Sequence, residues 1–467
     1  MKLNSKIFGV IVLILWVLIT LLRVSHHQPW YDEAHAYMLA QNLTIPELIA
    51  EMKYEGHLLV WYLLIMPFAK LKLWYPYPMQ ILNWLSAFIA LLVMWKKAPF
   101  HPVTKTIITF SYPFIAEMPV IARCYSVGIM LLIIIASLYH KSLKHPIWYA
   151  VLILLCANTS VMALFGATAF GIVFAYDLIR AALKDEVTRK DFRIVFSILA
   201  LCAVLVLWQI GGSLTCAVPK DGTFLINFSS FVFGNSIYNI QRTLITKYYI
   251  EAAIYLSLIC TPILLLIKDK KIFFINCFIF CCMMYCFLYK YPGFSQHYIF
   301  FWIYALIVYW LLIEKCISKT KLMIFAEIVL VLFWGIQFVS KEIKNTQVYH
   351  SESKTMAYAL KNLAEPNSRI IFVSSSLEPV IPYLEKENFE LYSIYRTVPK
   401  KMPLYVAYIS EAMSDDKTNY LFLEYSGAES DIVLRDNNTL LTLNSVALLR
   451  DKYALYKVAE EQINSEK

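Results

Sequence analysis

The chain is organised as a series of long apolar runs separated by short polar segments. A transmembrane helix needs about 20 predominantly apolar residues, and eleven runs approach that length. They are 7–23, 79–95, 103–120, 124–140, 146–160, 161–179, 194–212, 248–267, 272–289, 298–314 and 322–340. A further run, 58–74, is short and contains Pro67. The pattern predicts an α-helical polytopic membrane protein.

The positive charges between these runs predict the orientation, because Lys and Arg gather on cytoplasmic loops. If 58–74 lies along the outer interface without crossing, most basic clusters of residues 1–340 fall on one side. We therefore expect eleven crossings, with the amino terminus in the cytoplasm and the carboxyl terminus outside. The first run follows Lys2 and Lys6 and has no small-residue cleavage site after it, so we expect a retained signal anchor.

The outer segment 24–57 is expected to contain two short amphipathic helices, 31–42 and 46–53. Pro46 suits the first turn of the second helix, and Thr44 is a candidate cap. Short helices of this kind are expected to lie in the headgroup plane.

The composition changes after Lys341. Helical patterns over 352–363 and 376–386 alternate with strand patterns, which cover 369–373, 420–423 and 453–456. This alternation indicates a small α/β domain. The predicted domains are therefore 1–340, the membrane part, and 341–467, an extracytoplasmic α/β domain. The second has no Gly-rich phosphate loop and no triad signature, so we expect a passive cap, with docking or acceptor handling as the alternative.

The composition supports a membrane protein and indicates which kinds of partner it has. The chain is 59% hydrophobic and 16% charged, whereas a soluble chain carries about 25% charged residues. Residues 1–340 hold 27 Lys and Arg against 15 Asp and Glu, and residues 341–467 hold 15 against 18. The basic excess belongs to the membrane loops, so we expect membrane lipids and no nucleic acid as partners.

Two adjacent carboxylates, Asp32 and Glu33, follow the first apolar run. On a helix they point about 100° apart and need not share a site. Asp32 is the candidate general base, and Glu33 is a candidate metal ligand, orienting group or helix cap. Both would also suit a first helical turn without any catalysis. Glu33 and His57 are the candidate ligands for a divalent metal ion, together with His35 and Glu55.

Arg123 stands at the outer end of two apolar runs, beside Tyr125. It either reaches lipid headgroups or grips the phosphate of a lipid-linked donor. Glu117 is a candidate partner of Arg123 or a second acid. His297 and Tyr298 begin a late apolar run on the same predicted side. Such groups suit a basic, aromatic cavity for an anionic lipid carrier.

Three segments in this order resemble membrane glycosyltransferases of the GT-C fold, in particular the protein-mannosyltransferase and aminoarabinose-transferase group. The segment Trp30-Tyr31-Asp32-Glu33-Ala34 resembles the first-loop motif of that group. Gly56 to Tyr62 resembles its Gly-His-Pro-Pro-Leu-Tyr-Tyr segment, and Ala122 to Ser126 its Glu-Ala-Arg-x-Tyr-Ala segment. His297-Tyr298 takes the place of a late Arg-Tyr pair. The chain departs from the group where Pro-Pro is absent after His57 and where Ile121 replaces an acid.

The resemblance covers residues 1–340 and implies a GT-C-like fold with inverting transfer on the outer face. The donor would be a polyprenyl-phosphate sugar, and the acceptor a lipid, glycan or protein. Asp32 would be the catalytic base. Arg123, Tyr125, His57, His297 and Tyr298 would bind the donor. Some members of the group use a divalent ion, and the location implied is the bacterial inner membrane.

Two other classes stay open. A transporter or lipid-linked-sugar flippase would have charged or broken helices near the midplane. A noncatalytic assembly subunit would use the outer domain for binding.

Overall fold

A computed structural model gives the fold of most of the chain. It describes residues 5–53, 55–210, 269–291, 295–315, 352–373, 375–393, 412–414, 416–424, 432–435, 439–449 and 453–462, with Gly293, Ile328 and Ile409 besides. Two compact units are present. The first comprises Met1–Ser25, Leu43–Pro67 and Pro78–Val348, and the second comprises His26–Asn42, Phe68–Tyr77 and Tyr349–Lys467. The sequence predicted a division after residue 340, and the structure differs in joining 26–42 and 68–77 to the carboxyl-terminal part.

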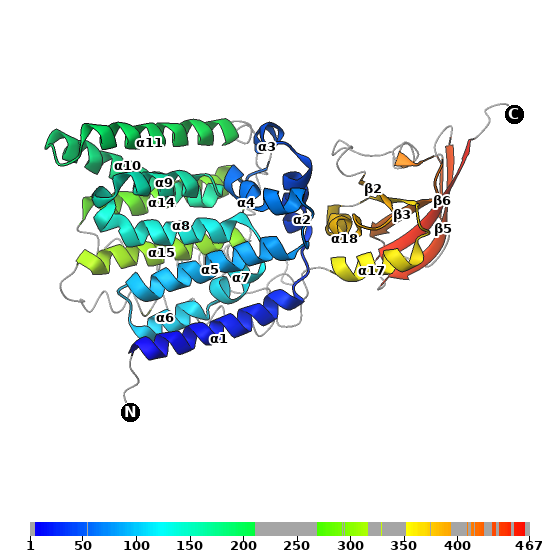
Figure 1. Ribbon diagram of the computed structural model, residues 1–467, viewed down its shortest axis with the longest axis horizontal. Helices are drawn as coiled ribbons and strands as arrows, with labels where there is room; N and C mark the ends of the chain where they lie inside the picture. Colours follow the sequence, from blue (N-terminus) through cyan, green and yellow to red (C-terminus); the bar gives the residue numbers. More distant parts are fainter. Residues whose placement is uncertain are drawn as a thin grey trace, which may run out of the picture. The chain divides into compact units, whose positions relative to one another are not determined.

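The first unit is a layered bundle of helices that run side by side (Figure 1). Its elements are α1 (Ser5–His26), α3 (Ile45–Glu51), α4 (Leu59–Lys70), α5 (Tyr77–Lys97), α6 (Pro102–Thr109), the π-helix η1 (Pro113–Glu117), α7 (Met118–Val120), α8 (Cys124–Leu138), the 3-10 helix η2 (Tyr139–Lys144), α9 (Pro146–Ala157), α10 (Val161–Leu183), α11 (Arg189–Ile210), α14 (Lys270–Tyr289) and α15 (Ser295–Lys315). Helices α8 and α10 pack closely, since a Cβ on Gly128 would lie 2.9 Å from that of Ala163.

Within the described residues, seven helices are long and apolar enough to cross a membrane. They include α1, α5, α10, α11 and α14 and the segments Cys124–Lys144 and Gln296–Lys315. Helices of this length and composition are compatible with the multi-pass membrane protein that the sequence predicts. The predicted spans 248–267 and 322–340 lie outside the described residues, so the total of eleven stays a prediction.

One predicted span is wrong as a single helix. Residues 103–120 form α6, η1 and α7 in succession, with an interruption at Phe110 and Ser111. Pro113 and Pro119 lack the amide hydrogen that a continuing helix would use. Helix α9 has 12 residues, or about 18 Å, which is less than the hydrocarbon thickness. The predicted span 146–160 is therefore shorter than a crossing helix, and so is α4, which has the same length and covers most of the run 58–74.

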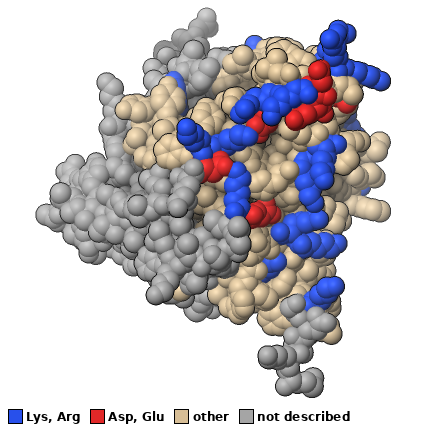
Figure 2. Space-filling model, turned by 90° about the vertical axis from the view of Figure 1, so that its left-hand side faces the viewer, with Lys and Arg blue, Asp and Glu red and all other residues tan. Residues whose placement is uncertain are grey.

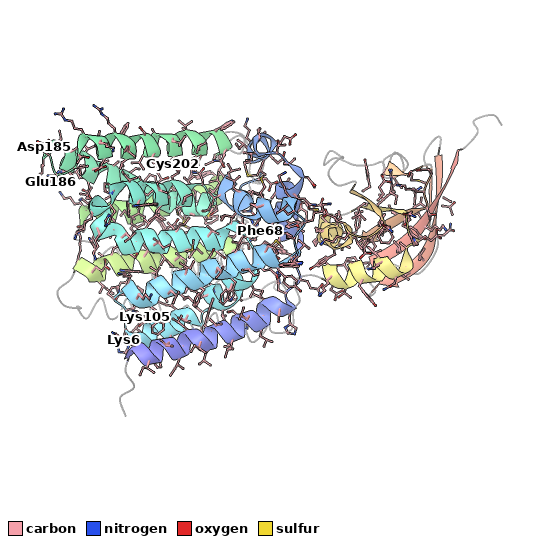
Figure 3. All side chains as sticks on the ribbon, viewed as in Figure 1. Lys6, Phe68, Lys105, Asp185, Glu186 and Cys202 are labelled. Atoms are coloured by element: carbon pink, nitrogen blue, oxygen red, sulfur yellow. The ribbon has the colours of Figure 1, made fainter. Side chains whose placement is uncertain are left out.

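Basic side chains gather at one end of the first unit (Figure 2). Helix α5 ends there at Lys96 and Lys97, and α15 ends there at Lys315. Lys6 and Lys105 lie at this end, together with Asp185 and Glu186 from the turn between α10 and α11 (Figure 3). Cys202, which Figure 3 also labels, lies along α11. The charged groups thus concentrate where these helices end.

The second unit contains a six-stranded sheet with the order β2-β1-β3-β6-β5-β4. The strands are β1 (Arg369–Phe372), β2 (Glu390–Ser393), β3 (Asn419–Glu424), β4 (Ile432–Arg435), β5 (Thr439–Leu449) and β6 (Tyr453–Gln462). Strand β1 pairs in parallel with β2 and β3, and the remaining pairs are antiparallel. The predicted strands at 369–373, 420–423 and 453–456 are confirmed.

Helix α17 (Ser353–Leu363) matches the predicted helix at 352–363. The helix predicted over 376–386 is instead the 3-10 helix η5 (Ser375–Val380) followed by the short α18 (Ile381–Leu384). Pro379 and Pro382 explain the difference, because each removes a backbone donor. Leu360, Phe372 and Leu377 belong to the core between these helices and the sheet.

Helix α2 (Tyr31–Asn42) has the predicted bounds but not the predicted surroundings. Eight of its 12 residues are buried, including Glu33, Tyr37 and Gln41. Instead of lying as an amphipathic helix in the headgroup plane, α2 packs against η5 within the second unit. Helix α3 keeps its predicted cap, since the Thr44 amide and hydroxyl both donate to Glu47, at 2.8 and 2.7 Å.

Candidate functional site

The first unit contains a chain of buried polar contacts around Arg123. Nη2 of Arg123 donates to Nε2 of His57 at 2.8 Å. The guanidinium carbon lies 5.0 Å from the centroid of the Tyr125 ring. The Tyr125 hydroxyl lies 2.7 Å from Nε2 of His297. The structure therefore brings together four of the predicted donor-binding residues from three distant parts of the sequence.

Arg123 is positioned by a backbone break before α8. It has an extended backbone as the N-cap of that helix, and its amide donates to Oδ1 of Asn83 at 3.3 Å. Nδ2 of Asn83 donates to the Met118 carbonyl, and the Ser126 hydroxyl donates to the same carbonyl at 2.7 Å. Asn83 was missed by the sequence reasoning. Its signal was a side-chain amide within the apolar run 79–95, where polar groups are costly unless they find partners.

His57 is positioned by backbone pairing with the turn between α9 and α10. It forms an isolated antiparallel bridge with Ser160. The Leu58 amide donates to the Thr159 carbonyl at 3.3 Å, and the Val60 amide donates to the Asn158 carbonyl at 2.9 Å. The imidazole is therefore held by main-chain contacts that do not depend on its own hydrogen bonds.

The contact between Arg123 and His57 has a chemical consequence. A guanidinium only donates, so Nε2 of His57 must accept and the imidazole must be neutral. Its proton then lies on Nδ1, which is 3.5 Å from Sγ of Cys124. Arg123 thus keeps its full positive charge in a site where it is 8% exposed.

A small pocket adjoins this cluster. Its polar lining comprises Glu117, Arg123, Tyr125, Ser126 and Gln296, and its apolar lining comprises Met118, Ile121, Ile129 and Ile299. Glu117 accepts a hydrogen bond from the Tyr112 hydroxyl at 2.8 Å. The pocket is therefore lined by one cation, one carboxylate and neutral hydrogen-bonding groups, besides its apolar wall.

Tyr298 is placed differently from the other predicted donor-binding residues. It is fully buried, and its hydroxyl donates to the Gly293 carbonyl at 3.1 Å. Gly293 has φ +76°, and a Cβ there would lie 2.9 Å from the Tyr298 ring. Tyr298 therefore holds the turn before α15 and positions His297.

Asp32 and Glu33 lie in the second unit, in the first turn of α2. Glu33 is fully buried. Its Oε2 accepts from Nε2 of His27 at 2.8 Å and from the Trp30 amide at 3.1 Å. These bonds satisfy donors at the start of the helix, so Glu33 acts as the cap that the sequence left open as an alternative. Asp32 is half-buried beside it.

The donor atoms do not fit the metal site that the sequence suggested. Nε2 of His57 carries the ring lone pair that a metal ion would bind, and it accepts a hydrogen bond from Arg123. Glu33 accepts hydrogen bonds from His27 and from the Trp30 amide. His35 lies 3.7 Å from Glu378, and Glu55 accepts from the Tyr62 hydroxyl at 3.2 Å. Within the described part of the chain, no group of three or more His, Cys, Asp or Glu residues is arranged to hold a metal ion.

Comparison with known proteins gives no assignment: no family model matches the chain, and no curated protein matches it significantly.

Proposed function

We propose that this protein is a membrane glycosyltransferase with a GT-C-like fold, which transfers a hexose or pentose from a polyprenyl-phosphate donor to an extracytoplasmic lipid, glycan or protein. The observation that carries the proposal is the buried cation of Arg123, held by His57 and covered by Tyr125. A lipid-linked phosphate is the anion that such a cation would meet at the end of membrane helices.

The reaction needs a base and a leaving-group stabiliser. In the proposed step an acceptor hydroxyl attacks the anomeric carbon of the sugar with inversion, and its proton passes to a carboxylate base, the role that the resemblance implies for Asp32. The bond between that carbon and the phosphate oxygen breaks, and the lipid phosphate leaves with the bonding electrons. Arg123 stabilises the charge that develops on this phosphate. No step is routed through a metal ion.

The charge distribution supports placing this chemistry outside the cell. The helix ends that carry Lys96, Lys97 and Lys315 are opposite to the ends from which Arg123 and His297 emerge (Figure 1). Because cytoplasmic loops are enriched in Lys and Arg, the basic end is assigned to the cytoplasm. The proposed location is the bacterial inner membrane, with the carboxyl terminus extracytoplasmic.

One observation favours the rival class of transporter or flippase. The segment from α6 to α7 is a broken helix with a π-helical turn and the buried Glu117, and broken helices line the substrate sites of many transporters. A flippase moves its lipid without cleaving it, so the lipid keeps its sugar. A transferase instead releases the polyprenyl phosphate without the sugar.

Mass spectrometry of membrane lipids in a deletion strain tests the proposal. The transferase function predicts that a sugar-linked polyprenyl phosphate accumulates and that re-expression of the protein depletes it. If the protein is instead a flippase, the deletion strain retains that lipid on the inner leaflet, where a membrane-impermeant periodate probe does not reach it. An unchanged lipid pool would contradict the transferase function.

A further inference from the structure

The second unit ties helix α2 to the carboxyl-terminal domain at three levels, although the segments are more than 300 residues apart. At its amino-terminal end, the Ser353 hydroxyl donates to the Pro29 carbonyl at 3.1 Å, and the Lys354 amide donates to Gln28 at 2.9 Å. In the middle, Nδ1 of His35 lies 3.7 Å from the buried Glu378.

The carboxyl-terminal end of α2 has the strongest connection. Nε2 of Gln41 donates to both carboxylate oxygens of Glu385, at 2.9 and 2.8 Å. Nζ of Lys72 lies 3.4 Å from the same carboxylate. Nζ of Lys70 donates to the Gln41 carbonyl at 3.3 Å, which satisfies one of the carbonyls that a helix end leaves without an intrahelical partner.

Aromatic packing reinforces this end. The Tyr75 ring lies between those of Tyr37 and Tyr383, with centroid distances of 4.7 and 4.9 Å. Burial, with a contribution from the Glu385 carboxylate, raises the pKa of Tyr37 to about 12. Tyr75 of the segment 68–77 therefore packs between α2 and α18.

We propose that the carboxyl-terminal domain positions Asp32, and that Glu385 is the positioning residue that holds α2 through Gln41. This inference rests on the proposed function, since it assigns to the domain a role in the same reaction. A passive cap would not need charge-assisted hydrogen bonds to the helix that carries the base. Charge-assisted bonds of this kind give geometric precision, and a misplacement of about 1 Å costs about 100-fold in rate.

Three full-length variants test the role of Glu385. Glu385→Ala removes both acceptors, Glu385→Gln keeps one oxygen that can accept from Gln41, and Glu387→Ala removes an exposed carboxylate that pairs with Lys361 on the same domain. The readouts are hydrogen exchange of residues 31–42 and of β1, binding of undecaprenyl phosphate, and the rate at which membranes consume the sugar-linked lipid.

We expect Glu385→Ala to raise exchange in residues 31–42 while β1 stays protected, and to lower lipid consumption about 10- to 100-fold. Binding of undecaprenyl phosphate stays unchanged, since Arg123 lies in the other unit. Glu385→Gln recovers most of the rate, and Glu387→Ala resembles the wild type. Unchanged exchange, or full turnover despite raised exchange, would overturn the proposal. If the wild type consumes no sugar-linked lipid, the proposed function fails, while the exchange data still decide whether Glu385 holds α2.

Discussion

Arg123 and His57 lie 2.8 Å apart, joined by a hydrogen bond in which the guanidinium donates to a neutral imidazole. They are 66 positions apart in the sequence, and they meet because His57 pairs with the turn before α10 and Arg123 is the N-cap residue of α8. The contact holds the guanidinium in place, and the proposed donor site is built around it.

Replacement of Arg123 by lysine is expected to lower transfer about 100- to 1,000-fold, which is the usual effect of losing one preorganised donor. Lysine keeps the charge but lacks the planar fork that reaches His57 while covering Tyr125. Initial rates of sugar-lipid consumption measure the effect. Arg180→Lys is a matched control, because Arg180 also lies over a tyrosine ring, that of Tyr176, at 5.7 Å. Wild-type rates for Arg123→Lys would remove Arg123 from the site.

The contact between Tyr125 and His297 is expected to stabilise the first unit. Tyr125→Phe removes the hydroxyl that lies 2.7 Å from the buried imidazole, and a buried group left without its partner costs about 1–3 kcal/mol. Thermal unfolding in detergent measures this cost for Tyr125→Phe, His297→Phe and the double variant. The double variant should lose less than the sum of the two single losses. Simple additivity would show that the two side chains do not interact.

The orientation of the membrane part is tested by single-cysteine labelling. A thiol introduced as Lys184→Cys, after α10, is expected to react with an impermeant maleimide only in permeabilised cells. A thiol introduced as Lys53→Cys, between α3 and α4, is expected to react in intact cells. Both variants are made in a chain whose ten native cysteines have been replaced, including Cys281, which is exposed on α14. Labelling of both positions from the same side would contradict the topology.

The carboxyl-terminal domain is expected to lose stability in acid. Hydrogen bonds from Arg369 and then Lys417 lower the pKa of Glu390 below its usual 4.5. A carboxyl whose pKa is depressed by folding stabilises the fold above its unfolded pKa, and that stability is lost as the pH falls through the folded value. Exchange protection of β1 and β2, corrected for intrinsic rates, should therefore fall below about pH 4.5.

The variant Glu390→Gln is expected to be less protected than the wild type at neutral pH and to change less on acidification. Glu387→Gln, in the exposed pair with Lys361, is the control for loss of a surface charge. Parallel pH profiles for the wild type and Glu390→Gln would show that Glu390 does not carry the effect.

Local patterns predicted much of this structure, and long-range contacts account for the rest. The bounds of α2 and the strands β1, β3 and β6 followed from apolar periodicity and turn residues. The division of residues 103–120 into separate helices was not predicted, because a hydropathy pattern does not register that Pro113 lacks an amide hydrogen. The cluster of His57, Arg123 and His297 was expected on one side, but its hydrogen bonds depend on pairing between distant segments.

The packing of α2 against the carboxyl-terminal domain was not predictable from the local pattern. Gln41 and Glu385 are separated by 344 positions, and nothing in either neighbourhood identifies the other. Asn83 was likewise visible only as a polar residue in an apolar run, and its bond to the Arg123 amide required the fold.

Asp32 as the general base is the central claim, and its direct test is the lipid-linked sugar pool in a deletion strain that expresses either the wild type or Asp32→Asn. Loss of a general base lowers turnover about 100- to 10,000-fold, so the account predicts that the sugar-linked polyprenyl phosphate accumulates with Asp32→Asn at normal protein abundance and disappears with the wild type. Depletion of that lipid by Asp32→Asn at the wild-type rate would contradict the account.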